Sequence, residues 1–232
     1  MGATALLVLL SSVPEYNDVL KMAVFLAPLA FMKHCKGPIR DLHKTLLNRI
    51  VAEPAEYQID PTYLSLLLDQ YCPSKNCINS LLLLTKMNSR SDIGDVKQDV
   101  FEHSPGEGSV KTLLHYMQLV ESGGFQLYDY GDLINRRTYR TSIPPSYNLS
   151  IIRVPVVMFS SISDVMANEM DIHMLTTQLP SLRMHYIVKE KEFTHYDYVW
   201  SSEAVDHIYI NLIHELETMS KHRKRTFMPM ML

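Results

Sequence analysis

The stretch Val154–Asp164 (VPVVMFSSISD) decides the fold of this chain of 232 residues. Its unbroken apolar run predicts a buried strand, because a strand that is covered on both faces lacks the alternation of a half-exposed one. The strand leads to the carboxylate of Asp164. A second stretch, Phe193–Trp200 (FTHYDYVW), places His195 in a loop just beyond another predicted strand. The two stretches therefore predict an acid and a histidine, each following a strand.

The segments around these two stretches predict a parallel sheet. We expect strands at 154–159 and Met184–Lys189, a helix near Glu169–Gln178 between them, and a last helix from Glu203 to about Lys221. Strands that alternate with helices are typical of parallel strands joined by crossovers. Nearer the N-terminus the pattern predicts a helix over residues 2–12 and a strand at Lys21–Ala27 that ends at Pro28.

The region between the two α/β parts has a different character. Its amphipathic segments near 42–50, 63–71 and 110–122 predict helices, without the strand–helix rhythm of a parallel sheet. An insertion between core strands is how a cap is attached to an α/β core. The predicted fold class is therefore α/β with a mostly helical insertion. The expected domains are a first core part (1–32), a helical cap or lid (33–150) and a C-terminal core part (151–232).

Composition and charge exclude several classes of protein. A net charge of -3 gives no electrostatic reason to expect a nucleic-acid partner. The longest apolar runs, 3–10 and 22–31, are shorter than the roughly 18 to 20 residues of a membrane-spanning helix. The first residues also lack the basic region of a signal peptide.

The cysteines and one glycosylation signal bear on the compartment. Cys72 and Cys77 could close a small disulfide loop and leave Cys35 unpaired, or all three could be free thiols in a reducing cytosol. Asn148 begins the triplet Asn-Leu-Ser, a sequon for N-glycosylation in a polar loop, which favours the secretory route.

Asp164 and His195 have the order and separation of the acid and base of a Ser-Asp-His hydrolase triad. An acid and a histidine at such a spacing also occur by chance, so spacing alone leaves the role open. A nucleophile is not evident, because none of the serines that we considered lies at a strand–elbow–helix turn; these are Ser104, Ser109, Ser160 and Ser161. No spacing of metal ligands is present either. His207, His214, Asp171 and Asp197 are interpreted as packing or local structural residues, and Trp200 is expected to pack beneath the site.

The motifs around the two residues resemble the acid lipase family, the gastric and lysosomal group of α/β-hydrolases. The resemblance runs in register from residue 1 to about 218. It rests on SVPEYN (12–17), APLAFM (27–32), HSPGEGS (103–109), SGGFQLYDYG (122–131), PPSYNLS (144–150), DVMAN (164–168), LPSL (179–182) and HYDYVW (195–200).

The resemblance implies a partial α/β-hydrolase fold in which Asp164 is the triad acid and His195 the base. The family's G-x-S-x-G elbow would end at Met1-Gly2, so that the nucleophilic serine is expected just upstream of Met1. The backbone N–H at the Met1 position would belong to the oxyanion hole. The chain is thus expected to be an N-terminally truncated portion of a lipase and to be inactive without that serine. A Cys72–Cys77 bridge is compatible with the family, although its spacing is closer than in the vertebrate members.

The function that the resemblance implies is hydrolysis of neutral lipid esters, triacylglycerols or cholesteryl esters, at a lipid–water interface. The mechanism would be that of a serine esterase with an acyl-enzyme intermediate, without a cofactor or a metal. The parent protein would be secreted or lysosomal. The alternative is a non-catalytic lipid-binding or interaction protein derived from an acid lipase.

Overall fold

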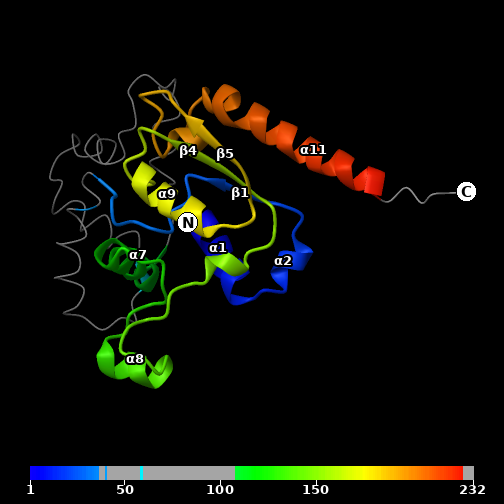
Figure 1. Ribbon diagram of the computed structural model, residues 1–232. Coiled ribbons are helices and arrows are strands. Elements are labelled where there is room, and N and C mark those ends of the chain that lie inside the picture. The colour runs from blue at the N-terminus through cyan, green and yellow to red at the C-terminus, as the bar shows by residue number, and fades with distance from the viewer. Residues whose placement is uncertain (37–39, 41–57, 60–107, 227–232) are drawn as a thin grey trace, which may run out of the picture.

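The computed structural model describes residues 1–36, 40, 58–59 and 108–226 (Figure 1). The predicted segments 42–50 and 63–71, Ser104, Cys72 and Cys77 lie outside these residues. The elements discussed below are α1 (Gly2–Ser12), α2 (Tyr16–Val19), β1 (Ala23–Leu26), β2 (Gln58–Ile59), β3 (Gly108–Ser109), α7 (Val110–Ser122), α8 (Asp132–Thr138), β4 (Val156–Ser161), α9 (Glu169–Gln178), β5 (Leu182–Val188), α10 (Asp197–Trp200) and α11 (Ile210–Thr226).

The main sheet has three parallel strands in the order β1-β4-β5. Ala23 pairs with Val156 on one side of β4, and Ser161 pairs with Val188 on the other. All six residues of β4 are buried, as expected for a strand with neighbours on both edges and cover on both faces. The predicted α/β class with parallel strands is therefore confirmed. β2 and β3 form a separate antiparallel pair.

The helices around the sheet follow the predicted pattern. α1 buries Leu7 and Leu10, three residues apart on one face, and ends just before Pro14. α9 begins after Asn168, whose side chain accepts a hydrogen bond from the Met170 N–H (3.0 Å) and so caps the helix. The predicted helices at 2–12 and 169–178 are confirmed.

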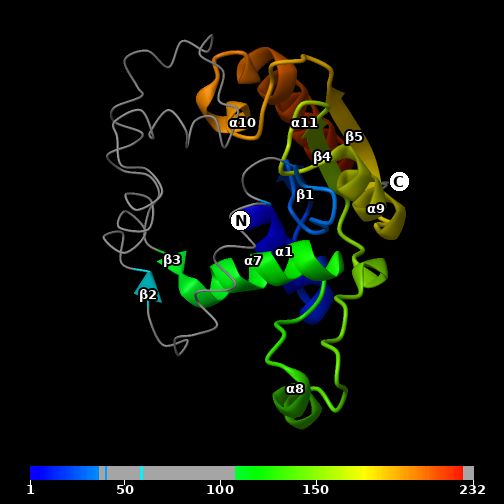
Figure 2. The same ribbon diagram turned by 90° about the vertical axis from the view of Figure 1, so that its left-hand side faces the viewer.

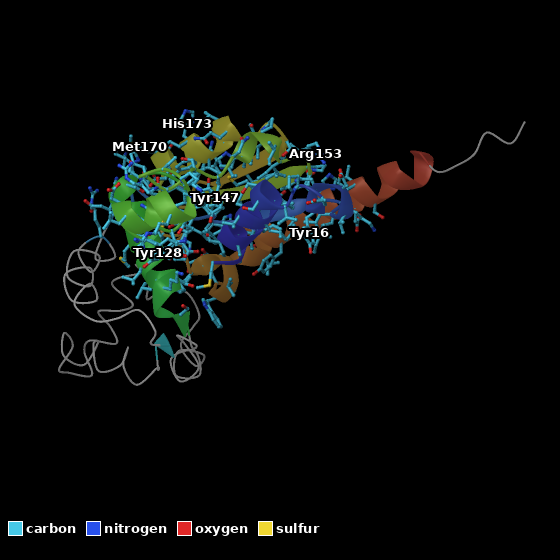
Figure 3. The ribbon with its side chains drawn as sticks, turned by 90° about the horizontal axis from the view of Figure 1, so that it is seen from below. Tyr16, Tyr128, Tyr147, Arg153, Met170 and His173 are labelled. Carbon is cyan, nitrogen blue, oxygen red and sulfur yellow. The ribbon has the colours of Figure 1, made fainter. Side chains whose placement is uncertain are left out.

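Asn17 fastens the end of α1 to the start of β4. Its amide NH₂ donates to the carbonyls of Leu10 and Pro14, both at 3.0 Å. Its side-chain oxygen accepts from the backbone N–H groups of Arg153 (2.8 Å) and Val154 (3.4 Å). The side chain is buried, and its bonds to the Leu10 carbonyl and the Val154 N–H are buried as well. In Figure 3, Arg153 and Tyr16 are labelled at this end of the molecule.

The part of the chain between the end of α7 and about Ser146 projects from the rest of the molecule, and we call it the arm. Gly123 ends this helix with a φ of 68°, and a Cβ at this position would lie 2.8 Å from the Lys33 side chain. Two segments on either side of α8 then run antiparallel, with a bridge between Gln126 and Ser146. Figure 2 shows α8 at the far end of this arm. The assignment of residues 33–150 to a cap or lid stays a prediction.

The C-terminal helix is tied to the edge strand β5. Glu215 on α11 is buried and accepts a hydrogen bond from the Tyr186 hydroxyl (2.9 Å). A π-helical turn at Val205–Tyr209 precedes α11, so that the predicted helix of 203–221 is found as two segments that extend to Thr226. The basic residues 221–225 thus belong to the last turns of α11.

Candidate catalytic pair

Asp164 lies three residues beyond the end of β4, and the chain turns around its carboxylate. Its Oδ1 accepts hydrogen bonds from the backbone N–H groups of Met166 (2.8 Å) and Ala167 (2.9 Å). These two bonds to the same oxygen fix the rotamer and leave the other oxygen, Oδ2, directed elsewhere. The side chain has no solvent exposure. A buried carboxylate needs such donors, because an unpaired charge away from water is costly.

His195 meets the second oxygen of this carboxylate. The distance from its Nδ1 to Asp164 Oδ2 is 2.8 Å, and the imidazole is 19% exposed. When the neutral ring donates its Nδ1–H to the carboxylate, Nε2 is left as the proton acceptor. The structure thus brings together the acid and the histidine that the sequence singled out, and it gives the pair the contact that a general base and its orienting carboxylate require.

The serines before Asp164 hold the histidine loop in place. Ser161 Oγ donates to the carbonyl of Phe193 (2.5 Å), and Ser163 Oγ donates to the carbonyl of Lys191 (2.6 Å). Asp197 ties the loop from within, since its Oδ2 accepts from both the N–H and the hydroxyl of Thr194. These contacts give Ser161 and Asp197 a structural place next to His195.

A second histidine–carboxylate pair joins the loop after β1 to α9. The Nδ1 of His34 lies 2.8 Å from Asp171 Oδ1, and Asp171 Oδ2 accepts the His34 backbone N–H, also at 2.8 Å. The Lys36 N–H donates to the Val165 carbonyl (2.7 Å), within the turn that follows Asp164. This pair was not predicted from the sequence, because its members are 137 residues apart. Together with the Lys36 bond, the pair joins the loop after β1 to α9 and to the turn that follows Asp164.

A serine and a histidine also meet between β4 and β5. Ser160 Oγ and His185 Nε2 are 2.8 Å apart. Burial lowers the pKa of His185, so that its imidazole stays neutral at neutral pH. Ser160 lies within a strand and not at an elbow, and among the described residues no carboxylate contacts His185. The arrangement therefore lacks the orienting acid of a triad.

Two tyrosines stay protonated beside the pair. Burial raises the pKa of Tyr196 and of Tyr198, and the charge of Asp164 raises both further. Tyr198 is buried and packs edge-to-face on Phe193, with ring centroids 5.1 Å apart. Trp200, by contrast, is 39% exposed. The expectation that it packs beneath the site is therefore wrong.

The remaining predicted site residues lie as follows. Met1 stands at the start of α1 with an exposed side chain. Asn148 is exposed, and its Oδ1 accepts from the N–H and the hydroxyl of Ser150. Ser109 precedes α7. His207 packs edge-to-face on Phe193 (5.6 Å), and Cys35 is buried as a free thiol.

The described ranges contain neither a cluster of metal ligands nor a membrane-spanning helix. No group of three or more His, Cys, Asp or Glu side chains in residues 1–36, 40, 58–59 and 108–226 is arranged to hold a metal ion. No helix in the same part of the chain has the length and apolarity to cross a membrane.

Comparison with known proteins relates the chain to lipases. It is 28% identical to Lipase 3 of Drosophila melanogaster over 227 residues, 94% of this chain and 58% of the relative. It is 29% identical to the human gastric triacylglycerol lipase, over 91% of this chain and 54% of the relative. It is 30% identical to the lysosomal acid lipase/cholesteryl ester hydrolase of Macaca fascicularis, with the same coverage of 91% and 54%. The chain thus spans about half the length of these relatives.

The comparison of folds gives more distant similarities. One is to a putative non-heme bromoperoxidase from Mycobacterium tuberculosis, with a TM-score of 0.47, 17% identity and coverage of 92% of this chain and 63% of that structure. Another is to a monoacylglycerol lipase from Paleococcus ferrophilus, with a TM-score of 0.47, 14% identity and coverage of 94% and 65%. No family model matches the sequence. The chain is thus an α/β protein whose sequence is similar to those of gastric and lysosomal acid lipases and of Drosophila lipases over about half of their length.

Proposed function

We propose that this chain provides the acid and the base of a serine hydrolase that cleaves neutral lipid esters. The observation that supports this most directly is the 2.8 Å contact between His195 Nδ1 and the buried Asp164 carboxylate. The names of the relatives point to the substrate class, since they specify triacylglycerols and cholesteryl esters. Neither substrate needs a metal or a cofactor for hydrolysis by a triad.

In the proposed mechanism, Asp164 holds His195 in the tautomer whose Nε2 is free to accept a proton. This nitrogen takes the proton of a serine hydroxyl as the serine attacks the ester carbonyl, and it then protonates the leaving alcohol. The acyl-enzyme that results is hydrolysed by a water molecule that the same imidazole activates. The carboxylate stabilises the imidazolium that forms in each half of the reaction.

The serine belongs, in this proposal, to an elbow that immediately precedes Met1 in the complete protein. The backbone N–H at the Met1 position would then follow the nucleophile and donate to the oxyanion. Residues 33–150 would form the cap or lid over an acyl groove. A secreted or lysosomal location, glycosylation at Asn148 and a Cys72–Cys77 bridge complete the proposal.

The test uses the protein translated from the complete transcript, with the sequence ahead of Met1 read from it. We expect a Gly-x-Ser motif there and labelling of its serine by a fluorophosphonate probe. Asp164→Asn should lower kcat for triolein or cholesteryl oleate by about 10⁴-fold, the loss that wrong tautomers cause in such triads. His195→Ala should abolish the activity.

The matched control is His173→Ala, which removes another histidine from the exposed face of α9 (Figure 3). This variant should keep the full rate. An in-frame stop ahead of Met1, or hydrolysis that persists in His195→Ala, would refute the proposed triad and favour a non-catalytic lipid-binding or interaction protein.

A further inference from the structure

The helix at the end of the arm has its polarity inverted. Asn135 of α8 has no solvent exposure, whereas the neighbouring Leu133 and Ile134 are 74% and 49% exposed. A surface helix normally buries its apolar side chains and exposes its polar ones. Here the polar side chain attaches the helix, and the two large aliphatic side chains are presented to solvent.

Asn135 is held by a complete set of hydrogen bonds. Its amide NH₂ donates to Asp129 Oδ1 (2.7 Å) and to the Ser142 carbonyl (2.9 Å). Its side-chain oxygen accepts the N–H of Tyr130 (3.0 Å). Because every polar atom of this buried amide is paired, the inverted orientation of α8 is built into the fold.

Aromatic contacts stiffen the arm behind the helix. The rings of Tyr128 and Tyr130 are in contact at a tilt of 56°, with centroids 4.8 Å apart, and the Tyr139 hydroxyl donates to the Tyr128 carbonyl (3.0 Å). Lys111 on α7 reaches across and donates to the Tyr130 hydroxyl (2.9 Å). In Figure 3 Tyr128 lies beside α7, in agreement with these contacts. The arm therefore presents its end in a defined orientation.

The end of the arm is also cationic. Arg136 pairs with Asp132 (2.9 Å), and Asp129 is engaged by Gly131 and Asn135. Arg137 and Arg140 have no acidic partner among the described residues, and both are exposed.

The turn after α8 adds a third aliphatic side chain. Arg140 has a φ of +66°, a left-handed conformation that costs a non-glycine residue about 1 kcal/mol. Beyond it Thr141 Oγ1 donates to the Ile143 carbonyl (2.7 Å), and Ile143 is 70% exposed. We call Leu133, Ile134, Arg137, Arg140 and Ile143 the tip surface.

We propose that the tip surface docks the protein onto an anionic phospholipid surface. Aliphatic side chains beside arginines match the two parts of such a surface, because the aliphatic groups enter the acyl region while the cations stay among the anionic headgroups. The tip lies at the projecting end of an arm, and a deformable lipid surface accepts a projection without needing a complementary cavity (Figures 1 and 2).

This proposal is independent of the triad, because vesicle binding requires no nucleophile. Loss of catalysis in the variants of Asp164 or His195 would leave it intact, and failure of vesicle binding would leave the proposed hydrolysis intact. The assay is therefore flotation of the whole 232-residue chain with vesicles of pure phosphatidylcholine and with vesicles of phosphatidylcholine and phosphatidylserine in equal amounts.

We expect binding to the anionic vesicles that weakens at high salt, and much weaker binding to the neutral ones. Arg137→Gln with Arg140→Gln should lower the partition coefficient roughly 30-fold, at about fivefold for each cation. Leu133→Ser with Ile134→Ser should lower it about tenfold, because less apolar surface enters the lipid.

The matched control is Val19→Ser with Lys21→Gln, which removes an exposed aliphatic side chain and an exposed cation elsewhere on the surface. It should bind as the parent does. Circular dichroism shows whether each variant keeps its helices, and the arginine variant alters only exposed side chains. Equal losses in tip and control variants, unchanged binding in both tip variants, or no binding of the parent chain would overturn the proposal.

Discussion

Asn17 provides the sharpest test of how the fold is held together. The buried amide donates to the carbonyls of Leu10 and Pro14 and accepts from the N–H groups of Arg153 and Val154. Three of these bonds are 3.0 Å or shorter. At a net value of about 1 kcal/mol for each good bond, Asn17→Ala should lower the free energy of unfolding by about 3 kcal/mol. That is a large part of a typical total of about 5–15 kcal/mol.

Asn17→Asp makes the test sensitive to pH. One carboxylate oxygen of the aspartate can still accept the Arg153 N–H. The other replaces the amide NH₂ and faces the carbonyl oxygens of Leu10 and Pro14, which cannot donate a hydrogen bond to it. Desolvation and these carbonyls raise the pKa of the introduced carboxyl above its unfolded value of about 3.9. The stability of the variant is therefore retained below about pH 4 and is lost as the pH rises through the folded pKa. The protonated carboxyl also regains one donor.

The measurement is urea unfolding of the parent chain, both Asn17 variants and the control Asn148→Asp, at pH 7 and at pH 4. Asn148 is exposed and caps only a short 3-10 turn, so its variant should lose about 1 kcal/mol or less. Relative to the parent, Asn17→Asp should be less destabilised at pH 4 than at pH 7. The reasoning fails if Asn17→Asp unfolds with the parent at pH 7, or if acid increases the difference between them.

Three further predictions concern buried groups. Tyr198 has a buried hydroxyl with no hydrogen-bond partner in the described part of the chain, so Tyr198→Phe should leave the thermal midpoint unchanged or raise it; a clear fall would reveal a partner. Asp171→Ala removes both acceptors of His34 and should cost about 2–4 kcal/mol in urea unfolding, whereas His34→Ala, which leaves one bond, should cost less; the reverse order would contradict the role of this pair in joining the loop to α9. Burial, with the charge of Asp171, raises the pKa of the Cys35 thiol, so maleimide should label this cysteine only after denaturation, and rapid labelling of the native chain, located by peptide mapping, would refute this.

The elements that the sequence predicted are those whose signal is local. β4 was predicted from an unbroken apolar run, α1 from helical spacing that ends before Pro14, and α9 from the alternation of strands and helices. The partnership of Asp164 and His195 was predicted from motif order, with spacing as weaker support. Its geometry depends on two parallel strands that end side by side, and the predicted crossover provided that arrangement.

Two kinds of feature were not predicted from the sequence. One depends on contacts between residues far apart in the chain, and the other departs from the usual burial of apolar side chains and exposure of polar ones. Nothing near His34 indicates a partner 137 residues away. The helical part of the arm is short, and its buried Asn135 and exposed Leu133 reverse the usual meaning of the hydrophobic pattern. Trp200 was wrongly placed because a large aromatic side chain near a site is not by itself evidence of burial.

The position of β4 in the middle of the sheet has a consequence for how the molecule opens. Its amides and carbonyls are paired on both edges, with β1 on one side and β5 on the other, whereas β5 pairs only with β4 in the sheet of the described residues. Local opening proceeds from the least-held parts of a structure. The amide hydrogens of β5, which leads to His195, should therefore exchange with solvent sooner than those of β4. When the contact between His195 and Asp164 opens, we expect His195 to move away while the Asp164 carboxylate keeps its hydrogen bonds in the turn after β4.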